Sequence, residues 1–254
     1  DPAPATTGLV LTATEAPLSK EQKAFNNLIV KGGTGNEVID ARNYTEAITI
    51  GGNDGNDTIY GDGGNDSIFA DNTGNDFKDQ VSLTTSIDAK LRDINDLTVT
   101  GDVNKATLEG DTLLINGLRA AGDLTLKANA VDQNPDLANA LTVQGNTRIE
   151  ARVKNTGTVN LNNKDNDFVR KVDLVDVGTT TLFDKNSLFI EGHAGVLTLT
   201  ANSVDQEQGG RLAVDNTTRI NAASVLLNNP ENDFKGLVDL NVSGLATLHD
   251  ANTL

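Results

Sequence analysis

Two neighbouring stretches of nine residues share one pattern rich in glycine and aspartate, and they constrain the fold more than any other feature. Residues 52–60 read GNDGNDTIY and residues 61–69 read GDGGNDSIF. The segment 32–40, GGTGNEVID, aligns with them, and 71–79, DNTGNDFKD, is a weaker copy. In segments 32–40, 52–60 and 61–69, turn-forming residues precede a short run with an apolar centre. The middle residue of that run is Ile39, Ile59 or Ile68 respectively. A tandem of such units predicts parallel strands stacked coil upon coil.

The acidic and glycine residues of these segments have the pattern expected for ligands of a hard cation. Glycine adopts positive φ without steric cost, so the loop can turn its carbonyl oxygens toward one point. Ca²⁺ accepts about six to eight oxygen ligands in flexible geometry. The predicted calcium ligands are Glu37, Asp54, Asp57, Asp66, Asp76, Gly33, Gly35, Asn53, Gly55, Gly64 and Gly74.

Residues 32–79, the Gly-Asp segment, resemble the repeat-in-toxin nonapeptide family. The resemblance implies a parallel β-roll with two nonapeptides per turn and Ca²⁺ between successive loops. Loops 32–37, 52–57 and 71–76 would then lie on one edge and loop 61–66 on the opposite edge. One ion would lie between Glu37 and Asp57 and another between Asp57 and Asp76. The family also implies export from a Gram-negative cell and folding where external calcium is high.

A second, longer repeat occupies the rest of the chain. The motif N-D-F starts at Asn75, Asn166 and Asn232, and each copy is followed by L-x-D-x-N-x-L. The segment GDLTLKANAVDQ at 122–133 also recurs as GVLTLTANSVDQ at 195–206. Short alternating runs such as LTVTG at 97–101 end at Gly, Asn or Asp, which predicts short strands joined by tight turns.

Residues 75–254 resemble the repeats of filamentous-haemagglutinin-like exoproteins, which implies a right-handed β-helix shaft. We therefore predict an all-β chain: a parallel β-roll over 32–79 continuing into a right-handed parallel β-helix over 80–254, together a β-solenoid. Residues 1–31 are predicted to form a strand (8–14) and a short helix (19–27), the helix on the capping-box spacing of Ser19 and Gln22.

Several residues carry more local expectations. The three phenylalanines of N-D-F should mark equivalent places in the stack, and Asp93, Asp184 and Asp250 should form turns through side-chain hydrogen bonds. Asn162 with Asn163, and Asn228 with Asn229, are predicted to form amide ladders at corners. His193 and His249 fit no metal or triad pattern and are interpreted as surface or turn residues. The sequence does not place Arg148, Arg152 and Arg219 together.

Composition excludes several classes of function. A formal charge of −16 argues against nucleic-acid binding, which depends on clustered Lys and Arg. The absence of Cys removes disulfides, thiol catalysis and Cys-based zinc sites. There is no run of about 18 apolar residues, so no membrane-spanning helix is expected. No serine has a G-x-S-x-G context, and we expect the protein not to be an enzyme.

These observations favour an extracellular, calcium-stabilised structural or adhesive solenoid, part of a surface adhesin, surface layer or biofilm matrix fibre on a Gram-negative bacterium. Self-association into filaments is expected, because the third repeat copy stops at Leu254 and strand 8–14 could pair with a neighbour. A longer natural polypeptide is the other expectation from that stop. Cell-surface or polysaccharide ligands are the candidate binding partners.

The alternative is a secreted polysaccharide lyase or epimerase carrying a calcium module. It requires carboxylates clustered with Arg, Lys or His on one face. Binding of ice or another flat surface through threonine ladders ranks lower, because the threonines do not recur at one loop position.

Overall fold

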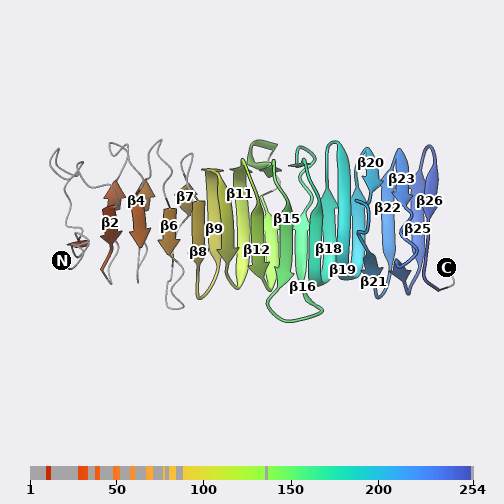
Figure 1. Ribbon diagram of the computed structural model, residues 1–254, viewed down its shortest axis with the longest axis horizontal. Helices are drawn as coiled ribbons and strands as arrows, with labels where there is room; N and C mark the ends of the chain where they lie inside the picture. Colours follow the sequence, from red (N-terminus) through yellow and green to blue (C-terminus); the bar gives the residue numbers. More distant parts are fainter. Residues whose placement is uncertain are drawn as a thin grey trace, which may run out of the picture.

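The protein is all-β, and its parallel strands stack along one axis into a β-solenoid. The computed structural model describes residues 10–12, 28–33, 38–40, 48–51, 58–60, 67–70, 77, 80–83, 88–134 and 137–252. Within these residues the only helical element is a single 3-10 turn, Leu137–Asn139. The chain advances from one end of the stack to the other (Figure 1). The predicted fold class is confirmed, while the helix expected over 19–27 lies outside the described residues.

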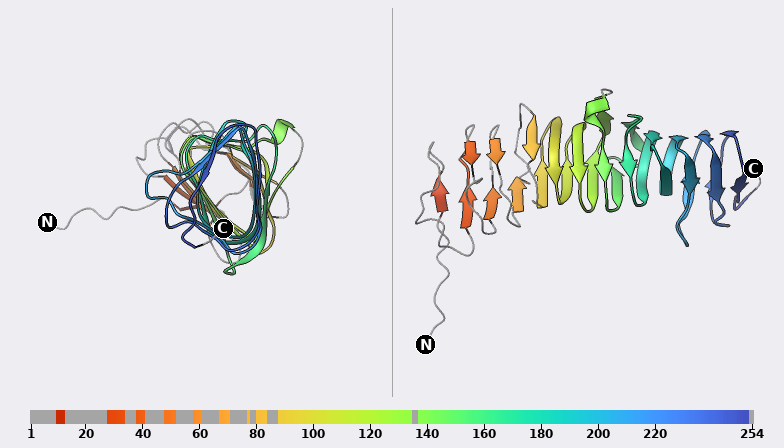
Figure 2. Two further views of the ribbon diagram at one scale, coloured as in Figure 1. Left: turned by 90° about the vertical axis from the view of Figure 1, so that its right-hand side faces the viewer. Right: turned by 90° about the horizontal axis from the view of Figure 1, so that it is seen from above.

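The strands form three parallel rows, which we call faces A, B and C in the order in which the chain visits them. Viewed along the axis, the coils have a rounded triangular outline (Figure 2). Face A contains β1 (Val10–Thr12), β2 (Leu28–Lys31), β4 (Ile48–Gly51), β6 (Ser67–Ala70), β8 (Asp88–Arg92), β10 (Lys105–Glu109), β12 (Leu124–Ala128), β15 (Thr147–Ala151), the start of β18 (Val172–Phe183), the middle of β19 (Ser187–Thr200), β21 (Leu212–Val214) and β24 (Asp233–Phe234). From β8 onward this face completes about eight turns.

Faces B and C complete each coil. Face B contains the first parts of β9 (Leu97–Val103) and β11 (Thr112–Ala120), β13 (Ala130–Gln133), β16 (Thr156–Leu161), the later parts of β18 and β19, β22 (Thr218–Ala222) and β25 (Val238–Val242). Face C contains β3 (Val38–Asp40), β5 (Thr58–Tyr60), β7 (Val81–Leu83), the ends of β9 and β11, β14 (Thr142–Val143), β17 (Asp167–Phe168), the start of β19, β20 (Ser203–Asp205), β23 (Ser224–Leu227) and β26 (Ala246–Leu248).

The Gly-Asp segment and the later repeats differ in how many described strands they place in each turn. In the Gly-Asp segment the described strands alternate between faces A and C. The first described strand on face B begins at Leu97. Strand β1 pairs along one edge with β2 of its own chain, Val10 opposite Ile29.

The interior is built from columns of aliphatic side chains stacked one coil apart. Leu91, Leu108, Leu126, Ile149 and Leu174 are successive register partners on face A, and each is at most 1% exposed. Alternation along a strand produces this column: β12 reads LTLKA, with Leu124, Leu126 and Ala128 buried. Because each residue packs on its counterpart in the next coil, the fold needs few aromatic side chains.

The long repeat does not complete a whole number of turns. Leu91, Leu182 and Leu248 are equivalent in sequence, yet they lie on faces A, B and C respectively. Each copy is therefore rotated by one face relative to the copy before it. Two equivalent glycines follow the same rotation: Gly101 pairs with Leu83 on face C and has φ of 105°, and Gly192 pairs with Leu174 on face A and has φ of 108°.

The N-D-F and D-x-N motifs meet in three dimensions. The backbone N–H of each phenylalanine donates to the carboxylate of the following D-x-N aspartate, at 2.8 Å for Phe77 to Asp93, 2.8 Å for Phe168 to Asp184 and 3.0 Å for Phe234 to Asp250. Asp93 and Asp184 also accept the N–H of the asparagine two residues later. The predictions of equivalent phenylalanines and of turn-forming aspartates are confirmed, the latter for Asp93 and Asp184.

The corner ladders of adjacent asparagines stay a prediction. Asn162 and Asn228 are exposed. In the second and third copies, the asparagine of N-D-F is buried and pairs reciprocally with a glutamine. The Asn166 amide bonds both ways with Gln133 at 2.7 and 2.9 Å, and Asn232 does the same with Gln206 at 2.8 and 2.9 Å. Buried polar side chains are stable only when they are hydrogen-bonded, and each of these asparagines has its partner in a glutamine of the neighbouring coil.

Candidate functional site

Most of the predicted calcium ligands lie outside the described residues. Gly33, just after β2, is the one described member, whereas Glu37, Asn53, Asp54, Gly55, Asp57, Gly64, Asp66, Gly74, Asp76 and Gly35 are not described. The strands that follow these loops are described. Ile39 is the register partner of Ile59 on face C, and Ile68 is the partner of Ile50 on face A. The isoleucine register is therefore the one expected if 32–37 and 52–57 precede neighbouring strands of one face.

In the part of the chain that the structure describes, no group of three or more Asp, Glu or His side chains is arranged to hold a metal ion. The calcium prediction accordingly concerns the Gly-Asp segment alone. No described helix is long and apolar enough to cross a membrane.

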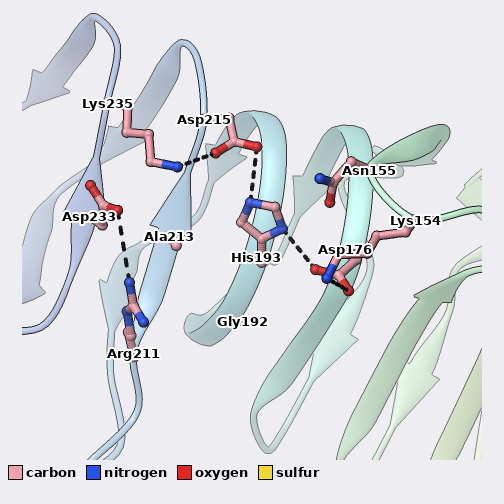
Figure 3. A pocket seen from close by; sticks show the side chains of 10 residues that line it. All are labelled: Lys154, Asn155, Asp176, Gly192, His193, Arg211, Ala213, Asp215, Asp233 and Lys235. Atoms are coloured by element: carbon pink, nitrogen blue, oxygen red, sulfur yellow. Dashed lines mark hydrogen bonds and ion pairs between the residues drawn. The ribbon is translucent and has the colours of Figure 1, made fainter.

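A cleft of about 580 Å³ in the later repeats gathers an unexpected set of charged side chains (Figure 3). His193, in β19, lies at its centre between two aspartates. Its Nδ1 is 3.0 Å from Asp176 Oδ1, and its Nε2 is 3.1 Å from Asp215 Oδ2. The side chain of this histidine is partly exposed in the cleft wall, so its interpretation as a surface residue is confirmed, although it lies in a strand and not in a turn. His249 is exposed, as expected.

Two lysines complete this row of charges across the coils. Lys154 Nζ lies 3.1 Å from Asp176 Oδ2, and Lys235 Nζ lies 2.8 Å from Asp215 Oδ1. Each aspartate therefore uses one carboxylate oxygen for a lysine and the other for His193. Arg211, beside them, is 3.8 Å from Asp233, too far for a hydrogen bond.

Backbone conformation contributes to the placement of Asp176. It has φ of 51°, a left-handed conformation that Asp tolerates better than most residues, and it lies at the corner between the face A and face B parts of β18. This corner directs the side chain toward the next coil, where His193 lies (Figure 3).

The electrostatics of the cleft keep both carboxylates ionised. The hydrogen bond from Lys154 is the largest cause that lowers the pKa of Asp176, and His193 acts in the same direction. The pKa of Asp215 is lowered chiefly by Lys235, again with a contribution from His193. Neither aspartate is therefore suited to be a general acid near neutral pH, which requires a raised pKa.

The three arginines considered from the sequence lie at separate places. Arg148 on face A forms an ion pair with Asp173 at 2.6 Å, and its repeat equivalent Arg219 on face B pairs with Asp239 at 2.9 Å. Arg152 lies near Glu109. None of the three lines the cleft.

The cleft residues could have been found from their spacing. Lys154, Asp176, His193, Asp215 and Lys235 follow one another at intervals close to the length of one coil. Residues that are one coil apart in the sequence lie side by side in a solenoid. The length of a coil could not be read from the sequence, so this spacing was not recognised as a signal.

The comparisons with known proteins give one match. A family model described as repeats of unknown function (DUF5649) matches residues 85–175 and 177–241, more than half of the chain. The chain belongs to this family. No curated protein and no solved structure is significantly similar to it.

The two DUF5649 matches follow the three-dimensional repeat. Both begin shortly before the L-x-D-x-N-x-L element, and the second match is shorter. In the first DUF5649 repeat, Leu91 pairs with Leu108, and Leu108 pairs with Leu126. The equivalents of Leu91 and Leu126 in the second repeat are Leu182 and Leu199. These two residues pair directly, with no strand between them. The shorter DUF5649 repeat therefore lacks the coil that contains β10.

The DUF5649 matches leave the two earlier resemblances as predictions. The Gly-Asp segment, residues 32–79, lies outside the matched residues, and the family description assigns no function to the repeats that do match.

Proposed function

We propose that this protein is an extracellular structural or adhesive shaft on the surface or in the matrix of a Gram-negative bacterium, stiffened by calcium in its Gly-Asp segment. The observation that carries the proposal is the uninterrupted pairing of face A, in which β6 of the Gly-Asp segment pairs with β8 of the DUF5649 repeats. Because the strands pair without a break, the Gly-Asp segment and the DUF5649 repeats form one rod. Stabilising either of them also stabilises the neighbouring coils.

Calcium is the proposed source of stiffness in the Gly-Asp segment. The in-register isoleucines support a nonapeptide winding, in which Glu37, Asp57 and Asp76 would bind ions on one edge and Asp66 on the other. Bound Ca²⁺ would cancel carboxylate repulsion, so folding and metal binding would form one equilibrium.

Calcium-dependent thermal unfolding of the full chain tests this proposal. We expect a higher Tm with Ca²⁺ than with a chelator, and loss of that difference in a variant combining D57N, D66N and D76N. The matched control is D102N, which neutralises an exposed aspartate on β9. A wild-type Tm that is the same with calcium and with chelator would overturn the calcium proposal.

Self-association is the proposed route from a single shaft to a fibre. Every coil adds to the stack by the same parallel pairing, so a second copy could extend the rod by that pairing. Deleting residues 1–18 removes β1 and changes the strand at that end of face A. We expect shorter filaments of this variant in electron micrographs, and filaments of unchanged length would count against strand addition at this end.

A secreted polysaccharide lyase or epimerase is the second candidate, since the His193 cleft gathers carboxylates with Lys, Arg and His on one surface. Incubation with uronate polymers would release unsaturated or epimerised products if the chain were such an enzyme. The lowered pKa values of Asp176 and Asp215 favour binding over catalysis.

A further inference from the structure

Face B presents an uncharged outer surface over three successive coils. It is formed by β16 and the later parts of β18 and β19, which follow one another along the stack (Figure 1). Leu161, Leu182 and Leu199 of these strands are buried, and strand alternation turns the intervening side chains outward. None of the outward residues is buried and none is charged; they are Thr158, Asn160, Thr179, Thr181, Phe183, Val196, Thr198 and Thr200.

The outward residues form columns that run along the solenoid axis. Asn160, Thr181 and Thr198 are successive register partners and make the middle column. Beside it, Phe183 is the register partner of Thr200. Because coils are about 4.8 Å apart, the middle column offers one amide or hydroxyl group at each step of that length.

The absence of charge is a local property of this surface. The middle column is bounded by Asp132 on one side and Arg219 on the other. On face A, the coils of β18 and β19 instead carry an outward ion pair, Lys171 with Glu191 at 2.6 Å. A charged ligand on the uncharged surface would lose hydration without gaining a partner of opposite charge. The surface therefore favours an uncharged ligand.

The size of this surface argues against a protein partner. Three coils at about 4.8 Å and about five residues at about 3.3 Å give a patch of roughly 250 Å². A stable protein interface needs about 800 Å² on each partner, so a second copy of the chain would also have to cover Asp132 and Arg219. The uncharged surface is suited to a narrower ligand with a flat face.

We propose that this surface binds an extended, uncharged polysaccharide of the cellulose or chitin type. Threonine hydroxyls and asparagine amides donate and accept hydrogen bonds without charge, as sugar hydroxyls do. Phe183 offers its ring to the apolar C–H face of a sugar. One coil is roughly as long as one sugar ring, so a polymer lying along the axis meets one polar group of the middle column at each ring. The inference names a ligand for the adhesive part of the proposed function, on which it rests.

Depletion of the full chain from calcium buffer by microcrystalline cellulose, and separately by crystalline chitin, tests the proposal. We expect saturable binding of the wild type to at least one of the two polymers. Combining T181V with T198V removes two hydroxyls and keeps the shape, so the affinity should fall about tenfold. F183A should also weaken binding. Raising the salt concentration from about 0.1 M to about 1 M should leave the affinity undiminished, because no charge takes part.

Each change has a matched control on another face. T107V with T125V removes two outward hydroxyls that are register partners on face A, and F189A removes an outward phenylalanine on face C. Both controls should bind like the wild type, and an unchanged Tm of every variant guards against misfolding as the cause.

Three results would overturn the proposal: no binding of the wild type to either polymer, equal losses in the face B variants and their controls, or binding that disappears at high salt. Sedimentation tests the other occupant. A wild-type dimer that T181V with T198V abolishes would assign the surface to a second copy and would also overturn the proposal. Absence of polysaccharide binding together with an intact calcium-dependent rise in Tm would leave the shaft proposal standing.

Discussion

Asp184 accepts the backbone N–H of Phe168 at 2.8 Å across one coil of the solenoid, and through this contact the two sequence motifs of the repeat become one structural unit. Its other carboxylate oxygen accepts the N–H of Asn186 at 2.6 Å. A 1% exposed side chain thus satisfies two backbone donors that no strand pairing would satisfy.

Removing this carboxylate should destabilise the fold strongly. Asp184→Ala leaves the N–H groups of Phe168 and Asn186 without an acceptor, at an expected loss of about 2 to 4 kcal/mol in the free energy of unfolding. Asp184→Asn keeps one acceptor oxygen and should lose less. Urea unfolding measures both, with exposed Asp102→Ala as the control. Equal stability of the Ala variant and the control would contradict the role assigned to Asp184.

The same residue predicts a pH dependence of defined sign. Burial raises the pKa of Asp184, against the opposing hydrogen bonds from Asn186 and Phe168. Between about pH 4, where an unfolded Asp titrates, and the raised folded pKa, the folded state retains a proton that the unfolded state has lost. This group's contribution to stability therefore falls as pH rises through that window. Asp184→Asn cannot titrate at this position, so the difference in unfolding free energy between wild type and Asp184→Asn should shrink over the same pH range. A difference that grows with pH would refute the raised pKa of Asp184.

Asp176 and Asp215 contribute with the opposite sign. Their folded pKa values are lowered, so their stabilisation is present above about pH 4 and is lost as pH falls through the folded pKa. Wild type and Asp184→Asn share the contribution of Asp176 and Asp215. It therefore cancels when the unfolding free energies of the two proteins are subtracted at each pH.

Much of the architecture was predictable because its signals are local and repeated. The alternation of LTLKA, the in-register isoleucines and the recurring N-D-F motif each predict a strand or a stacked position, and the structure confirms them for the described residues. The rotation of each repeat by one face was not predictable, because it depends on how many strands fill a turn.

The His193 cleft was missed for a related reason. Its residues do not belong to the repeat motif, and they come together only through the length of successive coils. The pairing of Gln133 with Asn166 was missed likewise, since the two are 33 residues apart and join different coils.

The coil that distinguishes the two DUF5649 repeats should be removable as a unit. Deleting residues 104–121 joins Val103 to Gly122 and reproduces the connection of the second repeat, so that Leu91 would pair with Leu126 as Leu182 pairs with Leu199. We expect a cooperative urea transition and β-sheet circular dichroism. Deleting only residues 104–112 should abolish the transition, because the strands would no longer stack in register. A failure of the whole-coil deletion to fold would contradict the coil equivalence.

Gly192 should tolerate a side chain much less well than Gly209 does. An ideal Cβ on Gly192 would lie 2.0 Å from the carbonyl oxygen of Leu174, and φ there is 108°. Gly192→Ala should therefore cost more than about 2 kcal/mol in the free energy of unfolding. At Gly209 nothing lies within 4 Å of the added Cβ, so Gly209→Ala carries only the cost of its positive φ, about 1 kcal/mol. Equal losses at the two sites in urea unfolding would contradict the close approach of the coils.

Hydrogen exchange of the full chain, followed residue by residue with Ca²⁺ and then with a chelator, tests most directly whether calcium stiffens the Gly-Asp segment. We predict that the amides of β3, β5 and β6 lose protection when calcium is removed, while those of β12, β15 and β22 keep theirs. Equal protection of β3, β5 and β6 in both conditions would contradict it.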